Sequence, residues 1–276
     1  MVDDYLSPER DAGYLHAMVS FAPGGSGGVG RAWLRGGAER LLGNLVELEA
    51  KTVGVAGRVM VAPRASDPLR SQPFSRRGWD AAVEAAGAEP EYVSVGLFSR
   101  RPEAVYTSLS VCVTASRLGA DATRGPGFDP AVHAERWVGL LGDVLDTADP
   151  AYAQISDRVG SQFNTALDMF LRRSRVSVAE SRTSLRGYAW VTVVPKELVE
   201  RLGGAAALAR SKAVVLARPL AAGGVLLQAT PTPAEFDSAA MRRLFRLLAP
   251  VLPAGRPRPL PGWEGLPVVL EDAARR

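Results

Sequence analysis

Cysteine and histidine are scarce in this sequence of 276 residues, which has one cysteine, Cys112, and two histidines, His16 and His133. A single cysteine cannot form an intramolecular disulfide, so we expect a reducing compartment. A zinc site would have to combine the two histidines with carboxylates, and neither histidine has a second ligand at metal-site spacing. The sequence therefore predicts no bound metal, and we expect no cofactor in the leading interpretation below.

Long apolar runs are also missing. The chain begins Met1-Val2-Asp3-Asp4, without the basic and apolar stretches of a secretion signal. No stretch approaches the roughly 18 consecutive apolar residues that a membrane-spanning helix needs. These absences predict a cytoplasmic protein with no membrane partner.

Neither basic nor acidic residues dominate the composition. The net charge is +4, from 33 basic and 29 acidic residues, and the basic residues are scattered in short clusters. So small an excess does not predict a nucleic-acid partner. Only three of the basic residues are lysines, which together with abundant Ala and Gly indicates a bacterial genome of high GC content.

The residues present are those of a globular chain, 47% hydrophobic and 22% charged. Apolar periodicity predicts an α+β fold in which helices pack on one face of one or more antiparallel sheets. The predicted strands are 14–21, 52–61, 92–98, 105–113, 188–194, 214–220 and 225–230. The predicted helices are a segment that ends near 49, then 79–86, 132–145, 151–172, 196–202 and 233–252, with loops at 63–77 and 121–129.

The order of these elements suggests two similar halves of βαββα type. A helix stop followed by Pro150 places the boundary between residues 1–148 and residues 149–276. The second half ends in a proline-rich tail that we expect to run extended. One compact domain is an alternative to two.

A glycine-rich run between the first predicted strand and helix has five glycines in residues 24–30. Gly25, Gly27 and Gly30 fit the dinucleotide fingerprint, in which backbone N–H groups hold a pyrophosphate. The next strand lacks the acidic residue expected at its end, and the same run also fits a nucleophile elbow at Ser26. A small-molecule or nucleotide-binding enzyme that uses this loop therefore remains an alternative.

Other conspicuous side chains have structural interpretations. Asp143 and Asp146 share a helix face and are expected to be surface charges. Cys112 ends a predicted strand and is expected to be a small core residue. Trp190 is expected in the core, and Trp263 is a candidate to dock the tail onto the domain.

The second half contains a Trp-bearing strand followed by a short helix that Leu-Gly-Gly closes. The residues concerned are 186–194, Leu198, 202–204, Leu208, 223–229, Leu247 and Pro250. This stretch of about 70 residues resembles the type VI immunity family. The resemblance implies a non-enzymatic cytoplasmic protein that protects a bacterium by binding and blocking one cognate toxin.

A scaffold or assembly component is a further alternative, and self-association stays open. For a protein-binding role, arginine and tryptophan on loops are the best first candidates, because both are enriched at interface hot spots. The predicted partner-binding residues are Arg76, Arg77, Arg100, Arg101 and Trp263.

Overall fold

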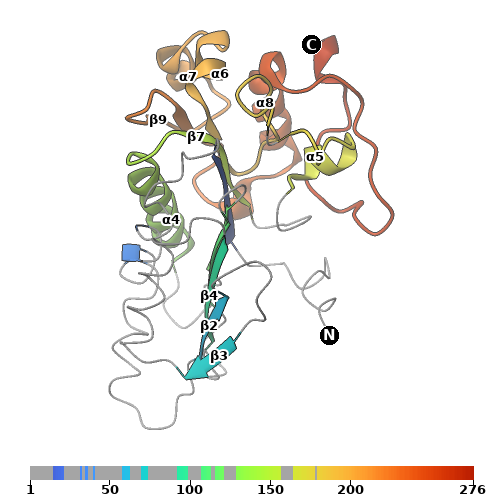
Figure 1. Cartoon of the computed structure of the whole chain (residues 1–276). Helices are drawn as coiled ribbons and strands as arrows, with labels where there is room; N and C mark the ends of the chain where they lie inside the picture. Colours follow the sequence, from blue (N-terminus) through green and yellow to red (C-terminus); the bar gives the residue numbers. More distant parts are fainter. Residues whose placement is uncertain are drawn as a thin grey trace.

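Figure 1 shows the fold as a computed structural model. The structure describes residues 15–21, 58–62, 70–73, 92–98, 107–112, 116–120, 129–156, 164–177 and 179–276, with four single positions between 32 and 40.

An antiparallel sheet of six strands organises the described part of the chain. Its order is β6 (Ser116–Ala120), β1 (Leu15–Phe21), β7 (Pro150–Ser156), β8 (Val191–Val194), β10 (Val225–Gln228) and β9 (Leu216–Pro219). A second antiparallel sheet has the order β3 (Arg70–Pro73), β2 (Arg58–Ala62), β4 (Tyr92–Phe98) and β5 (Thr107–Cys112). The predicted α+β class is confirmed.

Helices flank the six-stranded sheet on both sides rather than on one (Figure 1). α4 (Pro130–Leu145) lies on one side, while α5 (Ala166–Phe170) and α8 (Ser238–Leu248) lie on the other. From residue 196 onward, the further helical segments are α6 (Lys196–Arg201), α7 (Ala205–Arg210), η3 (Pro233–Glu235), η4 (Ala249–Val251) and η5 (Ala273–Arg275). No helix in the described ranges is both long enough and apolar enough to cross a membrane.

Several local predictions are confirmed with small shifts at their ends. α4 begins at Pro130, before the predicted start at residue 132. The Asp129 carboxylate accepts a hydrogen bond from the Ala131 N–H at 2.8 Å, and Pro130 suits the first helical position. β4 pairs with β5, and β9 pairs with β10, so each of these hairpins joins two predicted strands that follow one another in the chain. α6 and α8 lie within their predicted ranges.

Two local predictions are wrong, and two elements were not predicted. The first residues of the helix expected at 151–172 form β7, a strand that pairs with β1 on one side and β8 on the other. All its residues except Gln154 are buried, so the alternation that marks a half-buried strand is absent from its sequence. The loop expected at 63–77 contains β3, and β6 and α7 were not predicted.

The six-stranded sheet combines strands from both predicted halves, since β1 pairs with β7. The similarity of the halves is not confirmed, and the division after residue 148 stays a prediction. On the side of α5 and α8, the core includes Tyr152, Leu167, Tyr188 and Phe245. This core supports the C-terminal surface described next.

Candidate functional site

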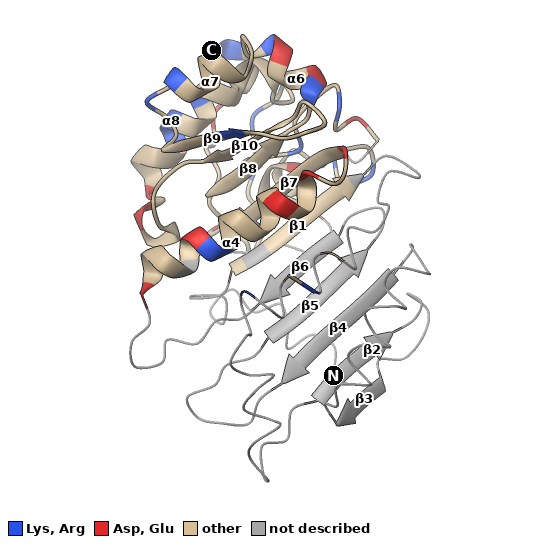
Figure 2. Ribbon diagram, turned by 90° about the vertical axis from the view of Figure 1, so that its left-hand side faces the viewer, with Lys and Arg blue, Asp and Glu red and all other residues tan. Residues whose placement is uncertain are grey.

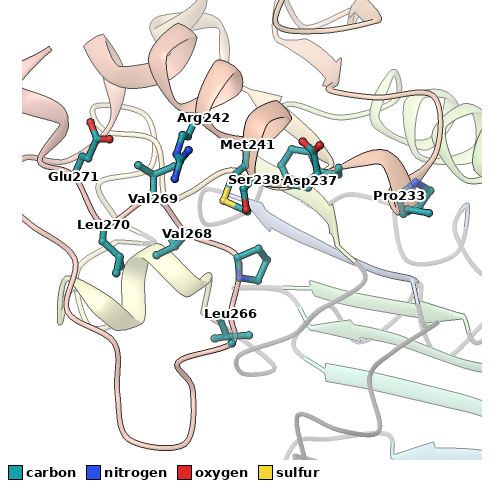
Figure 3. A pocket seen from close by; sticks show the side chains of 14 residues that line it. Pro233, Asp237, Ser238, Met241, Arg242, Leu266, Val268, Val269, Leu270 and Glu271 are labelled. Atoms are coloured by element: carbon teal, nitrogen blue, oxygen red, sulfur yellow. The ribbon is translucent and has the colours of Figure 1, made fainter.

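A groove of about 750 Å³ lies between the N-terminal end of α8 and the segment 265–271 (Figure 3). α8 contributes Met241 and Arg242 to one wall, preceded by the 3-10 turn η3. The other wall is an extended stretch that includes Leu266 and Val268. The lining of the groove therefore combines apolar side chains with the charged side chains of Asp237, Arg242 and Glu271.

The α8 wall is fixed by a cap and by one buried face. The carboxylate of Asp237 accepts hydrogen bonds from the N–H groups of Ala239 at 2.9 Å and Ala240 at 2.8 Å. The bond from Ala240 is the main reason that the pKa of Asp237 lies below its usual range. The helix buries Leu244 and Phe245 in the core, so its opposite face is left to solvent.

The extended wall is held to the core by Tyr188. The Val269 N–H donates to the Tyr188 hydroxyl at 2.8 Å, and the Tyr188 ring lies 5.9 Å from the ring of Phe245 on α8. Burial raises the pKa of Tyr188, so the phenol stays neutral at physiological pH. One side chain therefore fixes the distance between the two walls.

The C-terminal end of the same wall has its own attachment. The Asp272 carboxylate accepts hydrogen bonds from the N–H groups of Gly255 at 2.9 Å and Ala274 at 3.0 Å. The bond from Gly255 is the main cause of a lowered pKa at Asp272. Gly255 has φ of +119°, a conformation that glycine adopts without strain. The extended wall is thus held in place at Val269 and at Asp272.

Positive charge gathers at one end of the groove. Arg242 and Glu271 lie at this end, and Asp237 lies at the other (Figure 3). Glu271 forms a hydrogen-bonded ion pair with Arg276, and this contact is the main cause of its lowered pKa. The positive charges of Arg246 and Arg242 lower that pKa further, so cations surround this carboxylate.

A buried ion pair joins Arg186 to Asp168 of α5. Arg186 and Asp168 have side chains that are 0% and 1% exposed, with Nη2 and Oδ2 2.8 Å apart. Arg186 also donates to the hydroxyls of Ser20 on β1 at 2.5 Å and Ser177 at 3.3 Å. Its guanidinium lies 5.8 Å from the centre of the Tyr152 ring. This arginine therefore joins β1, β7, α5 and the segment before β8.

Residues of the stretch that resembles the immunity family have structural tasks in the fold. A Cβ on Gly187 would lie 2.7 Å from the Thr165 hydroxyl oxygen, so only glycine fits there without movement. The Trp190 indole N–H donates to the Thr230 carbonyl at 2.8 Å, and this side chain is 1% exposed. Gly203 and Gly204 have φ of +86° and +87°, which glycine adopts readily. The expectation that Trp190 lies in the core is confirmed.

The paired aspartates of α4 take part in a charge network with β9. Arg218 contacts Asp143 at 2.8 Å and Asp146 at 2.5 Å, and Arg40 contacts Asp143 at 2.6 Å. Figure 2 shows the acidic residues of α4 near the basic residue of β9. These surface charges therefore link a helix to the edge strand of the sheet.

Of the predicted site residues, Trp263 lies within the described part of the chain. Trp263 is half-buried in a turn where its backbone N–H donates to the Leu260 carbonyl at 2.9 Å, just before the extended wall of the groove. The other predicted residues lie outside the described residues; they are Arg76, Arg77, Arg100, Arg101, Gly25, Gly27 and Gly30. Within the described part of the chain, no group of three His, Cys, Asp or Glu side chains could hold a metal ion.

Sequence reasoning missed the groove itself. Its walls come from residues more than 20 positions apart, and no motif marks either one. The one signal that could have drawn attention is the sequence Met241-Arg242-Arg243 followed by Arg246, which places arginines on the polar face of a predicted helix. That pattern alone is common on solvated helices.

Residues 161–262 match the family model described as type VI immunity for VRR-NUC. The resemblance to a type VI immunity family is confirmed. The matched segment includes Arg186, Trp190 with the strand β8 that follows it, the hairpin of β9 with β10, and the α8 wall of the groove. It ends before the extended wall.

A solved structure, the Pseudomonas aeruginosa T6SS protein PA0821, has a similar fold. The TM-score is 0.54 with 13% sequence identity, and the likeness covers 95% of this chain and 79% of that one. At this identity the comparison shows the fold alone. No curated protein matches the chain.

Proposed function

We propose that this chain is an immunity protein that binds a cognate VRR-NUC toxin directly and thereby neutralises it. The match of residues 161–262 to the type VI immunity family carries the proposal, and the partner class comes from that family's description. The similar fold of a T6SS protein agrees with this role. Neutralisation by binding needs no chemistry from the immunity protein.

The proposal includes a place of action. The abbreviation VRR-NUC denotes a nuclease, and a nuclease is harmful only where it reaches nucleic acid. An immunity protein that protects its own cell must then meet the toxin in the cytoplasm. We therefore propose cytoplasmic action on one protein partner.

Direct binding is tested with the purified chain and a VRR-NUC toxin encoded in the same genome. We expect a stable complex in size-exclusion chromatography, with an interface of roughly 1,200–2,000 Å² that protects backbone amides from hydrogen exchange. Co-expression should restore growth to cells that produce the toxin. A toxin that kills equally well with and without the chain, and that forms no complex with it, would contradict the proposal.

A titration separates binding from an enzymatic antidote. Nuclease activity is measured while the chain is added to a fixed concentration of toxin far above the dissociation constant. Neutralisation by binding predicts a linear loss of activity that ends at one equivalent of the chain. Complete inactivation by a small fraction of an equivalent would instead indicate turnover, and the binding mechanism would be wrong.

A further inference from the structure

The outer face of α8 carries three exposed arginines, Arg242, Arg243 and Arg246. None of them forms an ion pair with another described residue. Arg242 and Arg246 are one turn apart and so project from the same side of the helix. Elsewhere in the described ranges, Arg182 and Arg218 have carboxylate partners. The α8 arginines are therefore available to an external anion.

The Glu271 carboxylate lies close enough to feel the charges of Arg242 and Arg246, but it forms an ion pair with neither of them. Glu271 is paired with Arg276, and its pKa is lowered by that contact and by the charges of Arg246 and Arg242. Three arginines, Arg242, Arg246 and Arg276, thus act on one glutamate at this end of the groove. Because guanidinium groups bind carboxylates through paired hydrogen bonds, the surface is suited to carboxylate side chains.

The groove beside the arginines has the shape and chemistry for an extended peptide. Its second wall is itself extended, and the Leu270 side chain is 43% exposed there. The backbone N–H groups of Val268 and Leu270 have no hydrogen-bond partner among the described residues. An extended segment laid along this wall could accept those hydrogen bonds, as a strand does at a sheet edge.

We propose that this groove and the α8 arginines bind an extended acidic segment of the toxin. Apolar side chains of the segment enter the groove beside Met241 and Leu270, and its carboxylates pair with Arg242 and Arg246. The inference rests on the proposed function and adds the surface and the chemistry of the partner. A phosphate backbone would use the arginines but would gain nothing from the apolar wall.

Calorimetry with a catalytically inactive VRR-NUC toxin from the same genome tests the surface. In the double variant Arg242→Glu with Arg246→Glu, we expect affinity to fall roughly 30-fold or more, as loss of a hot spot requires. The matched control is Arg210→Glu with Lys212→Glu, which reverses two exposed cations on and after α7 without touching the groove. The affinity of this control should be within about threefold of the wild-type affinity, because charges outside the interface contribute little to binding.

A third variant tests the apolar wall without reversing charge. Leu270→Ser removes an exposed apolar side chain from the groove, so the fold should survive, and we expect affinity to fall about tenfold. Far-UV circular dichroism confirms the fold of every variant before binding is measured.

Each outcome has one meaning. If wild type binds the toxin and the α8 variant binds equally well, the surface is wrong and the proposed function stands. If the α7 control loses as much affinity as the α8 variant, general charge explains the result and the inference is overturned. If a 20-base-pair DNA duplex, in the absence of toxin, binds wild type but not the α8 variant, and the α8 variant still binds the toxin as well as wild type does, the groove binds phosphate instead. If wild type does not bind the toxin, both proposals fall.

Discussion

Removing Asp168 should unfold much of the domain, because it would leave Arg186 buried without its counter-charge. The two side chains are 1% and 0% exposed and their charged atoms lie 2.8 Å apart. The same carboxylate accepts a hydrogen bond from the Thr165 N–H at 3.3 Å and completes the capping box of α5. Asp168→Ala therefore removes a counter-charge and a helix cap together.

The magnitude follows from the burial. Breaking one partner out of a buried pair typically costs about 3–5 kcal/mol, against a total stability of roughly 5–15 kcal/mol for a domain. Replacing both partners removes the unpaired charge. The double variant Asp168→Leu with Arg186→Met should therefore be less destabilised than Asp168→Ala by at least about 2 kcal/mol.

The pair also makes a prediction about pH. Burial raises the pKa of Asp168, and the Arg186 guanidinium acts in the opposite direction. Arg186→Met removes that opposing charge, so the pKa of Asp168 in the folded state should rise further above its value in the unfolded state. The folded state then holds its proton to higher pH, and the stability of Arg186→Met should fall as pH rises above about 4.

Urea unfolding, followed by circular dichroism and by tryptophan fluorescence, to which the buried Trp137 and Trp190 contribute, gives the free energies. We expect the ordering wild type, double variant, Asp168→Ala from most to least stable. A cost below about 1 kcal/mol for Asp168→Ala would refute the argument from burial. A double variant no more stable than the single variant would show that the lost helix cap, and not the unpaired charge, sets the cost.

Two further changes test local geometry. Gly187→Ala would place a Cβ 2.7 Å from the Thr165 hydroxyl oxygen in a buried site, so thermal unfolding should show a loss of about 1–3 kcal/mol; an unchanged melting temperature would contradict this. Asp143→Asn should flatten the loss of stability below about pH 4. The hydrogen bond from Arg218 lowers the pKa of Asp143, so its contribution is present above the unfolded-state pKa and is lost as pH falls through the folded-state value. Urea unfolding at pH 3 and pH 6 measures this difference, and equal differences for wild type and variant would contradict it.

The local sequence pattern predicted helices and strands correctly where one face of the element meets solvent. α8 buries Leu244 and Phe245 and exposes its arginines, so its period is visible in the sequence. The strands β4 and β5 pair as a hairpin around a short connection, which requires few long-range contacts. These elements could be predicted because each carries its own amphipathic or turn signal.

β7 is a strand that the local sequence pattern did not predict. The strand is central, covered on both faces, and begins with Pro150, a residue that also starts helices. Its assignment depends on β1 and β8, which lie far away in sequence and supply its hydrogen bonds. Nothing within seven residues of sequence distinguishes this strand from a short buried helix.

The α+β class, α4, the strands of the two hairpins and the likeness to an immunity family could be predicted from the sequence, because these depend on local periodicity and on a contiguous stretch of residues. Two contacts become visible only in the folded chain: Arg186 meets Asp168 out of water, and Tyr188 holds Val269 beside α8 to form a groove. Both contacts join residues that share no local pattern. Their energy comes from burial and hydrogen bonding, which exist only once the sheet has brought the segments together.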